Sequence, residues 1–328
     1  MIMTRTPLRI SLGGGGTDLP SYYRREGGFV LSAAINQYVY LSVHRRFFAR
    51  HLLRYSEVEE VERYEQIRHP LMREMLRTHA IDEPLEVVSV ADVPSGTGLG
   101  SSGSFAVGLA HALHAYRRHS VTAEQLAQEA VMVEMDRLGE PVGKQDPYIA
   151  AYGGLLCQHY HANDSVTVEP LSIGESALRE LRDSLMLFFL GRTRSASTLL
   201  SDQKRRSEEQ DQAMIENLRA TKQLGYQIRD ALEAGEVEAF GPLMHEHWLG
   251  KRARSVGMSN NHTDFLYDAA RHQGGATGGK LVGAGGSGFL LFQTKDRKRL
   301  RNTMSGHGLV EMDFQFDFDG SVILLRNQ

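Results

Sequence analysis

The chain has 328 residues, of which 41% are hydrophobic and 23% are charged, the proportions of a globular protein with a substantial core. Its net charge of −3, with acidic and basic residues interspersed, gives no field that would attract nucleic acid or an anionic membrane. The single cysteine, Cys157, rules out an intrachain disulfide, and no apolar run forms a secretory signal or reaches the roughly 20 residues of a membrane span, so we expect a cytoplasmic location.

The first half of the chain is expected to contain three strands followed by two helices. Residues 29–35 are expected to form one strand, and the alternating side chains of 38–45 predict a second. The segment LEVVSVA predicts another over 85–91. After the loop that ends at Gly100, a helix is expected from the helical spacing of Phe105, Leu109, Leu113 and Tyr116. A second helix is expected from Thr122, which forms a capping-box pattern with the glutamine three residues on, to Gly139.

The second half is expected to begin near residue 180, where the buried strand 185–190 opens a second domain. Short strands precede it between 151 and 170, and helices fill 197–256. A strand over 288–293 then follows a glycine-rich turn. Alternating phenylalanines before Asp319-Gly320 and an apolar run after it predict a terminal β-hairpin.

Three glycine-rich loops interrupt this pattern: RTPLRISLGGGGTDLP at 5–20, DVPSGTGLGSSGS at 92–104 and KLVGAGGSGF at 280–289. The middle loop follows a strand and opens a helix. Its glycines let the backbone approach a ligand, and the helix presents unpaired N–H groups with a partial positive charge, which suits phosphate. The alternative is that Ser101 or Ser102 simply caps the helix.

Neither standard nucleotide fingerprint fits this middle loop. A Walker A motif needs a lysine after its last glycine, where this chain has Ser101, and the order of strands and helices is not that of a Rossmann fold. The segment PSGTGLGSSGS instead resembles the second signature of the GHMP kinases, the superfamily of galactokinase, homoserine kinase and mevalonate kinase. The other two glycine loops lie where the first and third signatures belong.

This resemblance implies a two-domain α+β fold. Residues 1–180 would form an ATP-binding domain like domain 2 of ribosomal protein S5, and residues 181–328 a ferredoxin-like domain, with the active site between them. Within the superfamily, GGGGTDLP and the GKQDP segment at 143–147 are most similar to the D-glycero-D-manno-heptose 7-phosphate kinases. The sequence resembles the carboxy-terminal half of fucokinase more than it resembles mevalonate kinase.

The resemblance also assigns roles to individual side chains. Asp146 matches the carboxylate that faces the acceptor hydroxyl, although its position before Pro147 also fits an N-cap. Arg9 matches the basic residue opposite that aspartate, where a guanidinium keeps a carboxylate ionised and can steady the transferring phosphoryl group. Glu134 matches a Mg²⁺ ligand that acts beside Ser102. It lies roughly 80° round the helix from Leu126, so an amphipathic edge residue is the alternative.

Two ligand sets follow from the same resemblance. The residues expected at the ATP phosphates are Pro94, Ser95, Gly96, Thr97, Gly98, Leu99, Gly100, Ser101 and Ser102. Those expected at the sugar substrate are Gly15, Gly16, Thr17, Asp18, Arg192, Arg194, Lys280 and Gly285. Galactokinase-like members carry glutamate and histidine where this chain has Gly15 and Gly16, so galactose itself is a doubtful substrate. His245 and His247, two apart on an expected helix, cannot share a face, so no zinc site is expected there.

The implied activity is transfer of the γ-phosphoryl group of ATP, with Mg²⁺, to the anomeric hydroxyl of a heptose 7-phosphate. The 1,7-bisphosphate would feed nucleotide-activated heptose for surface or capsule polysaccharide. The alternatives are another GHMP kinase acting on fucose or a hexose, and a kinase-derived sugar sensor without turnover. The expected partner is a small sugar phosphate, with no nucleic acid or membrane, and a homodimer is left open.

Overall fold

The computed structural model describes residues 1–191, 197–255, 257–283, 285–286 and 288–327. Its larger sheet has eight strands in the order β12-β1-β2-β5-β3-β4, with β6 paired to β2 and β7 paired to β6. Neighbouring strands are antiparallel except β3 and β5. These strands are β1 (Ile2–Gly13), β2 (Gly28–Arg45), β3 (His51–Arg54), β4 (Val58–Val61), β5 (Leu85–Ala91), β6 (Leu155–Tyr160), β7 (Val166–Pro170) and β12 (Val322–Arg326).

Strand β2 replaces the two strands expected over 29–35 and 38–45. Ile35 pairs with Leu8 and Tyr38 pairs with Pro7, so two residues of β2 have no counterpart on β1. This bulge bends the strand and lets one long element continue through it. The expected strand over 85–91 is present with the same bounds.

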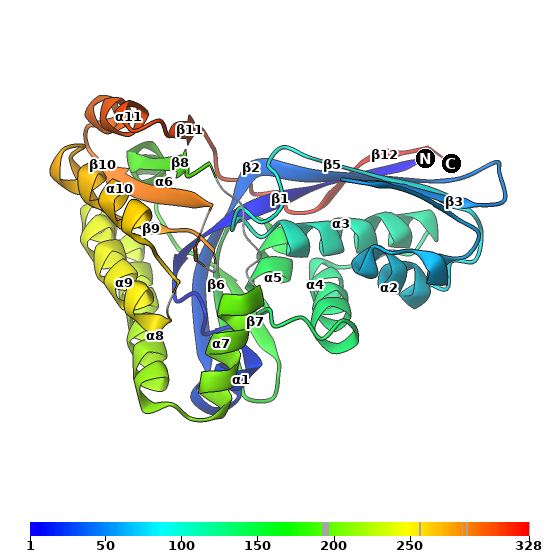
Figure 1. The fold of residues 1–328 in the computed structure, drawn as a ribbon, viewed down its shortest axis with the longest axis horizontal. Coiled ribbons are helices and arrows are strands. Elements are labelled where there is room, and N and C mark those ends of the chain that lie inside the picture. The colour runs from blue at the N-terminus through cyan, green and yellow to red at the C-terminus, as the bar shows by residue number, and fades with distance from the viewer. Residues whose placement is uncertain (192–196, 256, 284, 287, 328) are drawn as a thin grey trace.

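Helices cover one face of the large sheet, below it in Figure 1. The core between them contains the apolar faces of β1, β2 and α3. The capping box expected at Thr122 is present, but the helix that it opens changes after residue 131 into a π-helical segment, η2. These helices are α2 (Pro70–Thr78), α3 (Ser101–Tyr116), α4 (Ala123–Val131), η2 (Met132–Arg137) and α5 (Gln145–Tyr152), with the short η1 (Tyr64–Gln66) before α2.

A half-buried carboxylate links three of these helices. Glu129 of α4 accepts hydrogen bonds from His79 Nε2, 2.6 Å away, and from His114 Nε2, 2.7 Å away. His79 follows α2 and His114 lies in α3. These separations are hydrogen-bond lengths, so the cluster joins the helices as a charge-assisted network.

The second sheet has four strands in the order β11-β8-β10-β9 and lies at the opposite end of the molecule from the two chain termini (Figure 1). Trp248 is fully buried beside it, with its ring centroid 5.7 Å from that of Tyr267. Helix α8 packs against α9 and also against β1 and β2, so it joins the two sheets. The elements here are α6 (Glu175–Ser184), β8 (Leu185–Phe189), α8 (Gln212–Glu233), η3 (Val237–Ala239), α9 (Phe240–Arg254), α10 (Asn261–His272), β9 (Ala276–Leu281), β10 (Phe289–Thr294), α11 (Arg297–Gly306) and β11 (Val310–Met312).

The expected terminal hairpin is wrong. Strand β11 pairs with β8 in the small sheet, whereas β12 pairs with β1 in the large one. Between them Asp317 Oδ1 accepts hydrogen bonds from the N–H groups of Asp319 and Gly320, which turns the chain toward β1. The last strand therefore belongs with the first domain in space, although the expected domain bounds place it in the second.

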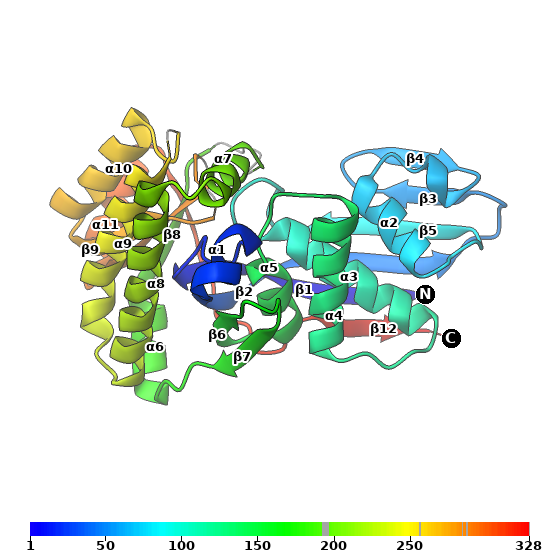
Figure 2. The same cartoon turned by 90° about the horizontal axis from the view of Figure 1, so that it is seen from below.

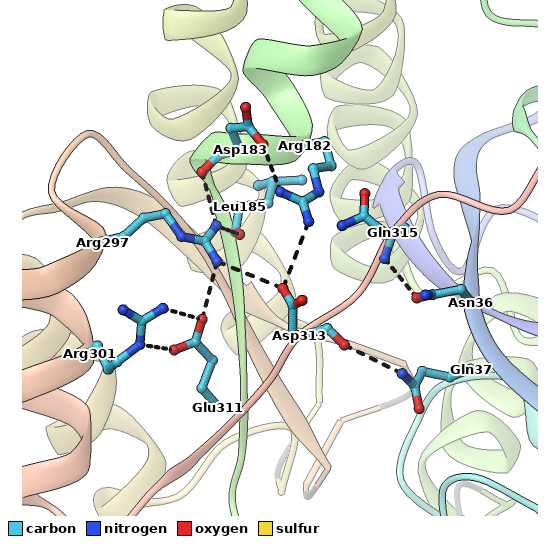
Figure 3. A network of polar contacts seen from close by, with 10 residues as sticks. All are labelled: Asn36, Gln37, Arg182, Asp183, Leu185, Arg297, Arg301, Glu311, Asp313 and Gln315. Atoms are coloured by element: carbon cyan, nitrogen blue, oxygen red, sulfur yellow. Dashed lines mark hydrogen bonds and ion pairs between the residues drawn. The ribbon is translucent and has the colours of Figure 1, made fainter.

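The returning chain is held to both sheets by polar side chains, as Figure 3 shows. Glu311 pairs with Arg297 and Arg301 of α11 on the side of the small sheet. On the side of the large sheet, Gln37 donates to the carbonyl of Asp313. The side chain of Asn36 in β2 accepts a hydrogen bond from the N–H of Gln315. The crossing is thus anchored at both ends.

Two further helices, α1 (Pro20–Glu26) and α7 (Ser197–Glu208), lie against each other below the junction of the two sheets (Figures 1 and 2). Within the described ranges, no helix is both long and apolar enough to cross a bilayer.

Candidate active site

A bidentate ion pair lies at the centre of the candidate site. Arg9 of β1 donates from Nε to Asp146 Oδ1 over 2.7 Å and from Nη2 to Asp146 Oδ2 over 2.9 Å. Its third nitrogen donates to the carbonyl of Gly98 over 2.5 Å. Arg9 is 7% exposed, whereas the Asp146 side chain is 29% exposed and lines a cavity. The pairing fixes the orientation of a carboxylate that can still reach a ligand.

Asp146 does not cap its helix. The N-cap of α5 is Lys144, so Asp146 lies inside the first turn. The N-cap alternative from the sequence therefore does not describe this residue. An acidic side chain in a first turn is favoured by the helix dipole, which helps to hold it there.

The middle glycine loop leads into α3 without a side-chain cap. Gly100 is the N-cap, with a φ of 79°, and no side chain of the described residues bonds to the first-turn N–H groups. The capping alternative for Ser101 and Ser102 is therefore not seen. The open N–H groups and the partial positive charge of the helix remain available to an anion.

The third glycine loop lies directly against the middle one. A Cβ added to Gly283 would stand 2.5 Å from backbone atoms of Gly98. Both residues have positive φ, and only glycine permits this approach without displacing the chain. The loops expected from the sequence at 92–104 and 280–289 thus meet in space.

Glu134 is brought to Ser102 by the π-helical segment η2. The Ser102 hydroxyl donates to Glu134 Oε1, and the carboxylate is 3% exposed. Burial raises the pKa of Glu134 to about 7, and the charge of Asp146 adds to this effect. A buried carboxylate and a hydroxyl beside a second carboxylate form a donor set that fits a hard cation such as Mg²⁺.

Asp18 lies where the first glycine loop leads into α1, beside the start of α5. Its carboxylate accepts from the N–H groups of Gly16 and Gln145, each 3.1 Å away. Burial raises the pKa of Asp18, while these hydrogen bonds act in the other direction. The contact requires Gly143, because a Cβ there would stand 1.9 Å from Asp18 Oδ2.

These groups line one cavity of about 970 Å³, large enough for a nucleotide and a small sugar together. The end between β5 and α2 is mainly apolar and suits a flat base, with Tyr55, Leu71, Val93 and Phe105 in its wall. The expected residues in the wall are Arg9, Gly15, Gly16, Asp18, Pro94, Ser95, Gly96, Gly98, Gly100, Ser101, Ser102, Glu134, Asp146, Lys280 and Gly285.

Some expected residues lie elsewhere. Thr17 is buried behind the first loop, where its hydroxyl bonds to the carbonyls of Gly14 and Phe29, so it supports the loop and does not line the cavity. Thr97 and Leu99 are likewise absent from the cavity wall. Arg192 and Arg194 lie outside the described residues.

Sequence reasoning missed several polar side chains that line the cavity. Ser11 Oγ, Gln145 Nε2 and both ring nitrogens of His247 are buried without a partner among the described residues. Lys251 and Arg254 of α9 also reach this wall. Their residue types are unremarkable in sequence, and only the packing of α9 against β9 brings them to the site.

Comparison with known proteins identifies relatives of the whole chain. The protein-family model described as GHMP kinases N terminal domain matches residues 67–154. The family model described as GHMP kinases C terminal matches residues 228–308. D-glycero-alpha-D-manno-heptose 7-phosphate kinase of Campylobacter jejuni is 28% identical, and the alignment covers 97% of each chain.

Two further similarities are weaker. The bifunctional fucokinase/GDP-fucose pyrophosphorylase of Arabidopsis thaliana is 25% identical over 92% of this chain, which corresponds to 31% of that longer protein. The crystal structure of a D-glycero-D-manno-heptose 1-phosphate kinase from Bacteroides thetaiotaomicron has the same fold, with a TM-score of 0.82, complete coverage of both chains and 24% identity.

Proposed function

This chain belongs to the GHMP kinase superfamily and is a phosphotransferase that acts on a sugar hydroxyl, and we propose that its acceptor is D-glycero-D-manno-heptose 7-phosphate. The acceptor would be phosphorylated at the anomeric hydroxyl, to give a 1,7-bisphosphate for nucleotide-activated heptose and surface polysaccharide. The choice of acceptor is supported by the relative from Campylobacter jejuni, which carries the name of this substrate and aligns with nearly the whole chain.

The donor in this proposal is ATP, as in other GHMP kinases, with its phosphates on residues 94–104. The open first turn of α3 supports this placement, because its N–H groups suit phosphate oxygens. Ser102 and Glu134 would hold Mg²⁺. When bound, that ion neutralises charge on the phosphate oxygens. The apolar end of the cavity would take the adenine ring.

The bidentate pair of Arg9 and Asp146 is the observation that carries the catalytic assignment. Arg9 holds Asp146 in one orientation at the cavity wall. The acceptor hydroxyl would lie against this carboxylate, its oxygen would attack the γ-phosphorus, and its proton would pass to Asp146 as ADP leaves. Catalysis then rests mainly on alignment and on neutralisation of charge.

Replacement of Asp146 by asparagine tests this role. The amide keeps the size of the side chain but cannot take the proton, so we expect turnover to fall about 10²- to 10⁴-fold, the usual contribution of a general base. The affinity for ATP, measured by isothermal titration, should remain near that of the wild type. Turnover within a few-fold of the wild type would contradict a catalytic role for Asp146.

A panel of acceptors tests the proposed substrate. Heptose 7-phosphate, heptose 1-phosphate, free heptose, L-fucose and galactose should be compared by kcat/KM with saturating ATP. We expect the 7-phosphate to be used best. The 1-phosphate is an informative competitor, because the related Bacteroides structure is named for it. Preference for fucose would favour the alternative that the Arabidopsis relative suggests, and ATP binding without ADP release on any sugar would favour a sensor.

A further inference from the structure

Lys280 brings an ammonium group to the cavity wall without a partner in the described part of the chain. It lies in β9, is 2% exposed and lines the cavity wall. Among the described residues it donates no hydrogen bond, and no carboxylate oxygen lies within 4.0 Å of it. Burial, with the nearby charges of Arg9 and Arg254, lowers the pKa of Lys280 to about 7. A buried cation with this environment is costly unless an anion joins it.

His247 lies close enough to Lys280 to feel its charge, and its ring also lacks a partner among the described residues. It is on α9, is 2% exposed and lines the same cavity. Neither ring nitrogen has a hydrogen-bond partner in the described part of the chain. Burial is the main cause that lowers the pKa of His247, and the positive charges of Lys280, Arg254 and Lys251 lower it further. Native proteins rarely leave two such polar atoms unsatisfied, so a ligand is expected to satisfy them.

The two buried cations that α9 contributes to this wall already have partners. Lys251 donates to the carbonyls of Leu281 and Gly283, which holds the third glycine loop. Arg254 donates to the carbonyl of Gly15 over 3.1 Å, and to Asn217 and Thr221 of α8. Both side chains therefore hold loops in place, whereas Lys280 and His247 remain available to bind a ligand.

We propose that Lys280 and His247 form an anion subsite that binds the phosphate already carried by the acceptor sugar, an inference that rests on the proposed function. The charged groups that act on the pair are Arg9, Lys251 and Arg254, all cations. A phosphate monoester dianion compensates them, accepts from the ammonium of Lys280 and satisfies a ring nitrogen of His247.

The position of the pair favours the acceptor over ATP as the source of this phosphate. Lys280 comes from β9 of the small sheet and His247 from α9, which packs against β9. Arg254 joins α9 to the first glycine loop, where Asp18 lies. The ATP phosphates have their own donors at the first turn of α3, next to Ser102 and Glu134. The pair therefore belongs to the sugar end of the cavity.

Kinetics of Lys280→Met on two acceptors test this assignment. Wild-type enzyme should use heptose 7-phosphate far better than free heptose. Loss of a charged hydrogen bond should lower kcat/KM of the variant about 10- to 100-fold on heptose 7-phosphate, mainly through KM, and leave the value for free heptose and the KM for ATP nearly unchanged. An equal loss on both acceptors, or a raised KM for ATP, would overturn the assignment. His247→Asn should show the same selective loss, to a smaller extent.

Proton uptake by the enzyme on ligand binding is a second measurement, and it would not change if Lys280 had only a structural role. The pKa values of Lys280 and His247 are lowered in the ligand-free site. An anion that raises these pKa values causes the enzyme to take up protons at pH 8. Titration of heptose 7-phosphate into enzyme saturated with a non-hydrolysable ATP analogue, in buffers of different ionisation enthalpy, should show net uptake that is reduced in Lys280→Met. Unchanged uptake would refute the role of Lys280. An unaltered thermal unfolding midpoint confirms that the variant folds.

Failure of the heptose assignment would be distinguishable from failure of this inference. If wild-type enzyme does not use heptose 7-phosphate, inorganic phosphate replaces it in the same titration with the analogue bound. Binding to the wild type but not to Lys280→Met would support the anion subsite while the sugar is reassigned. Equal binding to both, or to neither, would overturn the subsite itself.

Discussion

Replacement of Gly103 by alanine should disturb catalysis without unfolding the protein. Gly103 lies in the first turn of α3, where that helix crosses the start of α5. An added Cβ would stand 2.7 Å from the Cβ of Asp146, 2.9 Å from its carbonyl carbon and 2.9 Å from the nitrogen of Pro147. All three atoms belong to or adjoin the backbone, so no rotamer change can relieve the contact.

The expected magnitudes follow from these distances. Ordinary contacts between carbon atoms are about 3.5–4.0 Å, so α5 must withdraw by roughly 1 Å. Alanine in a helix gains about 1 kcal/mol over glycine, whereas overpacking costs about 1–3 kcal/mol, so the net loss of stability should be small. A displacement of this size at Asp146 should lower turnover by about 10²-fold.

The assay is ADP release with saturating ATP and acceptor, combined with urea unfolding. Gly306, the last residue of α11, is the matched control, because an added Cβ there meets no atom within 4 Å. Gly306→Ala should keep full turnover and gain up to about 1 kcal/mol of stability. Turnover of Gly103→Ala within threefold of the wild type would refute the argument, since it would show that α5 can move without consequence for Asp146.

Three further predictions concern stability. Because burial raises the pKa of Glu134 from 4.5 to about 7, stability without ligands should fall as pH rises through this interval, and Glu134→Gln should remove that slope in urea unfolding between pH 5 and 8. Burial would raise the pKa of Glu129, but hydrogen bonds from His114 and His79 lower it to about 2. Glu129→Gln should therefore cost about 1–3 kcal/mol at pH 7, a difference that shrinks as pH falls from 4.5 toward 2. Trp248→Ala should cost about 3–5 kcal/mol by the same measurement, because the side chain is fully buried, and a loss below 1 kcal/mol would contradict its place in the core.

Local patterns in the sequence were sufficient for much of the fold. The apolar segment LEVVSVA predicted the strand over 85–91 with the observed bounds, and the capping box at Thr122 is formed as expected. Both features depend on neighbours within a few residues, so the sequence reports them directly. The membership in the GHMP kinases, the two-domain α+β fold and the sugar kinase activity also followed from the three glycine loops and are confirmed by the comparisons.

Features that depend on distant parts of the chain were not visible in the sequence. The terminal strand was expected to fold back on its neighbour, but β1 offers a longer partner across the molecule. The π-helical segment that turns Glu134 toward Ser102 could not be predicted from the spacing of apolar residues. His247 was considered only as a metal ligand, because its spacing from His245 says nothing about what lies opposite α9.

The sequence by itself determined where the backbone can approach a ligand, since glycine content and helix starts are local properties. Only the tertiary structure decided which charges are left without partners inside the cavity. Arg9 and Asp146 lie far apart in the chain and bond to each other, whereas Lys280 and His247 line the same cavity without a side-chain hydrogen-bond partner among the described residues. The physical reason is that the cost of a buried charge depends on everything packed around it, and that environment exists only after the two sheets have closed on the cavity.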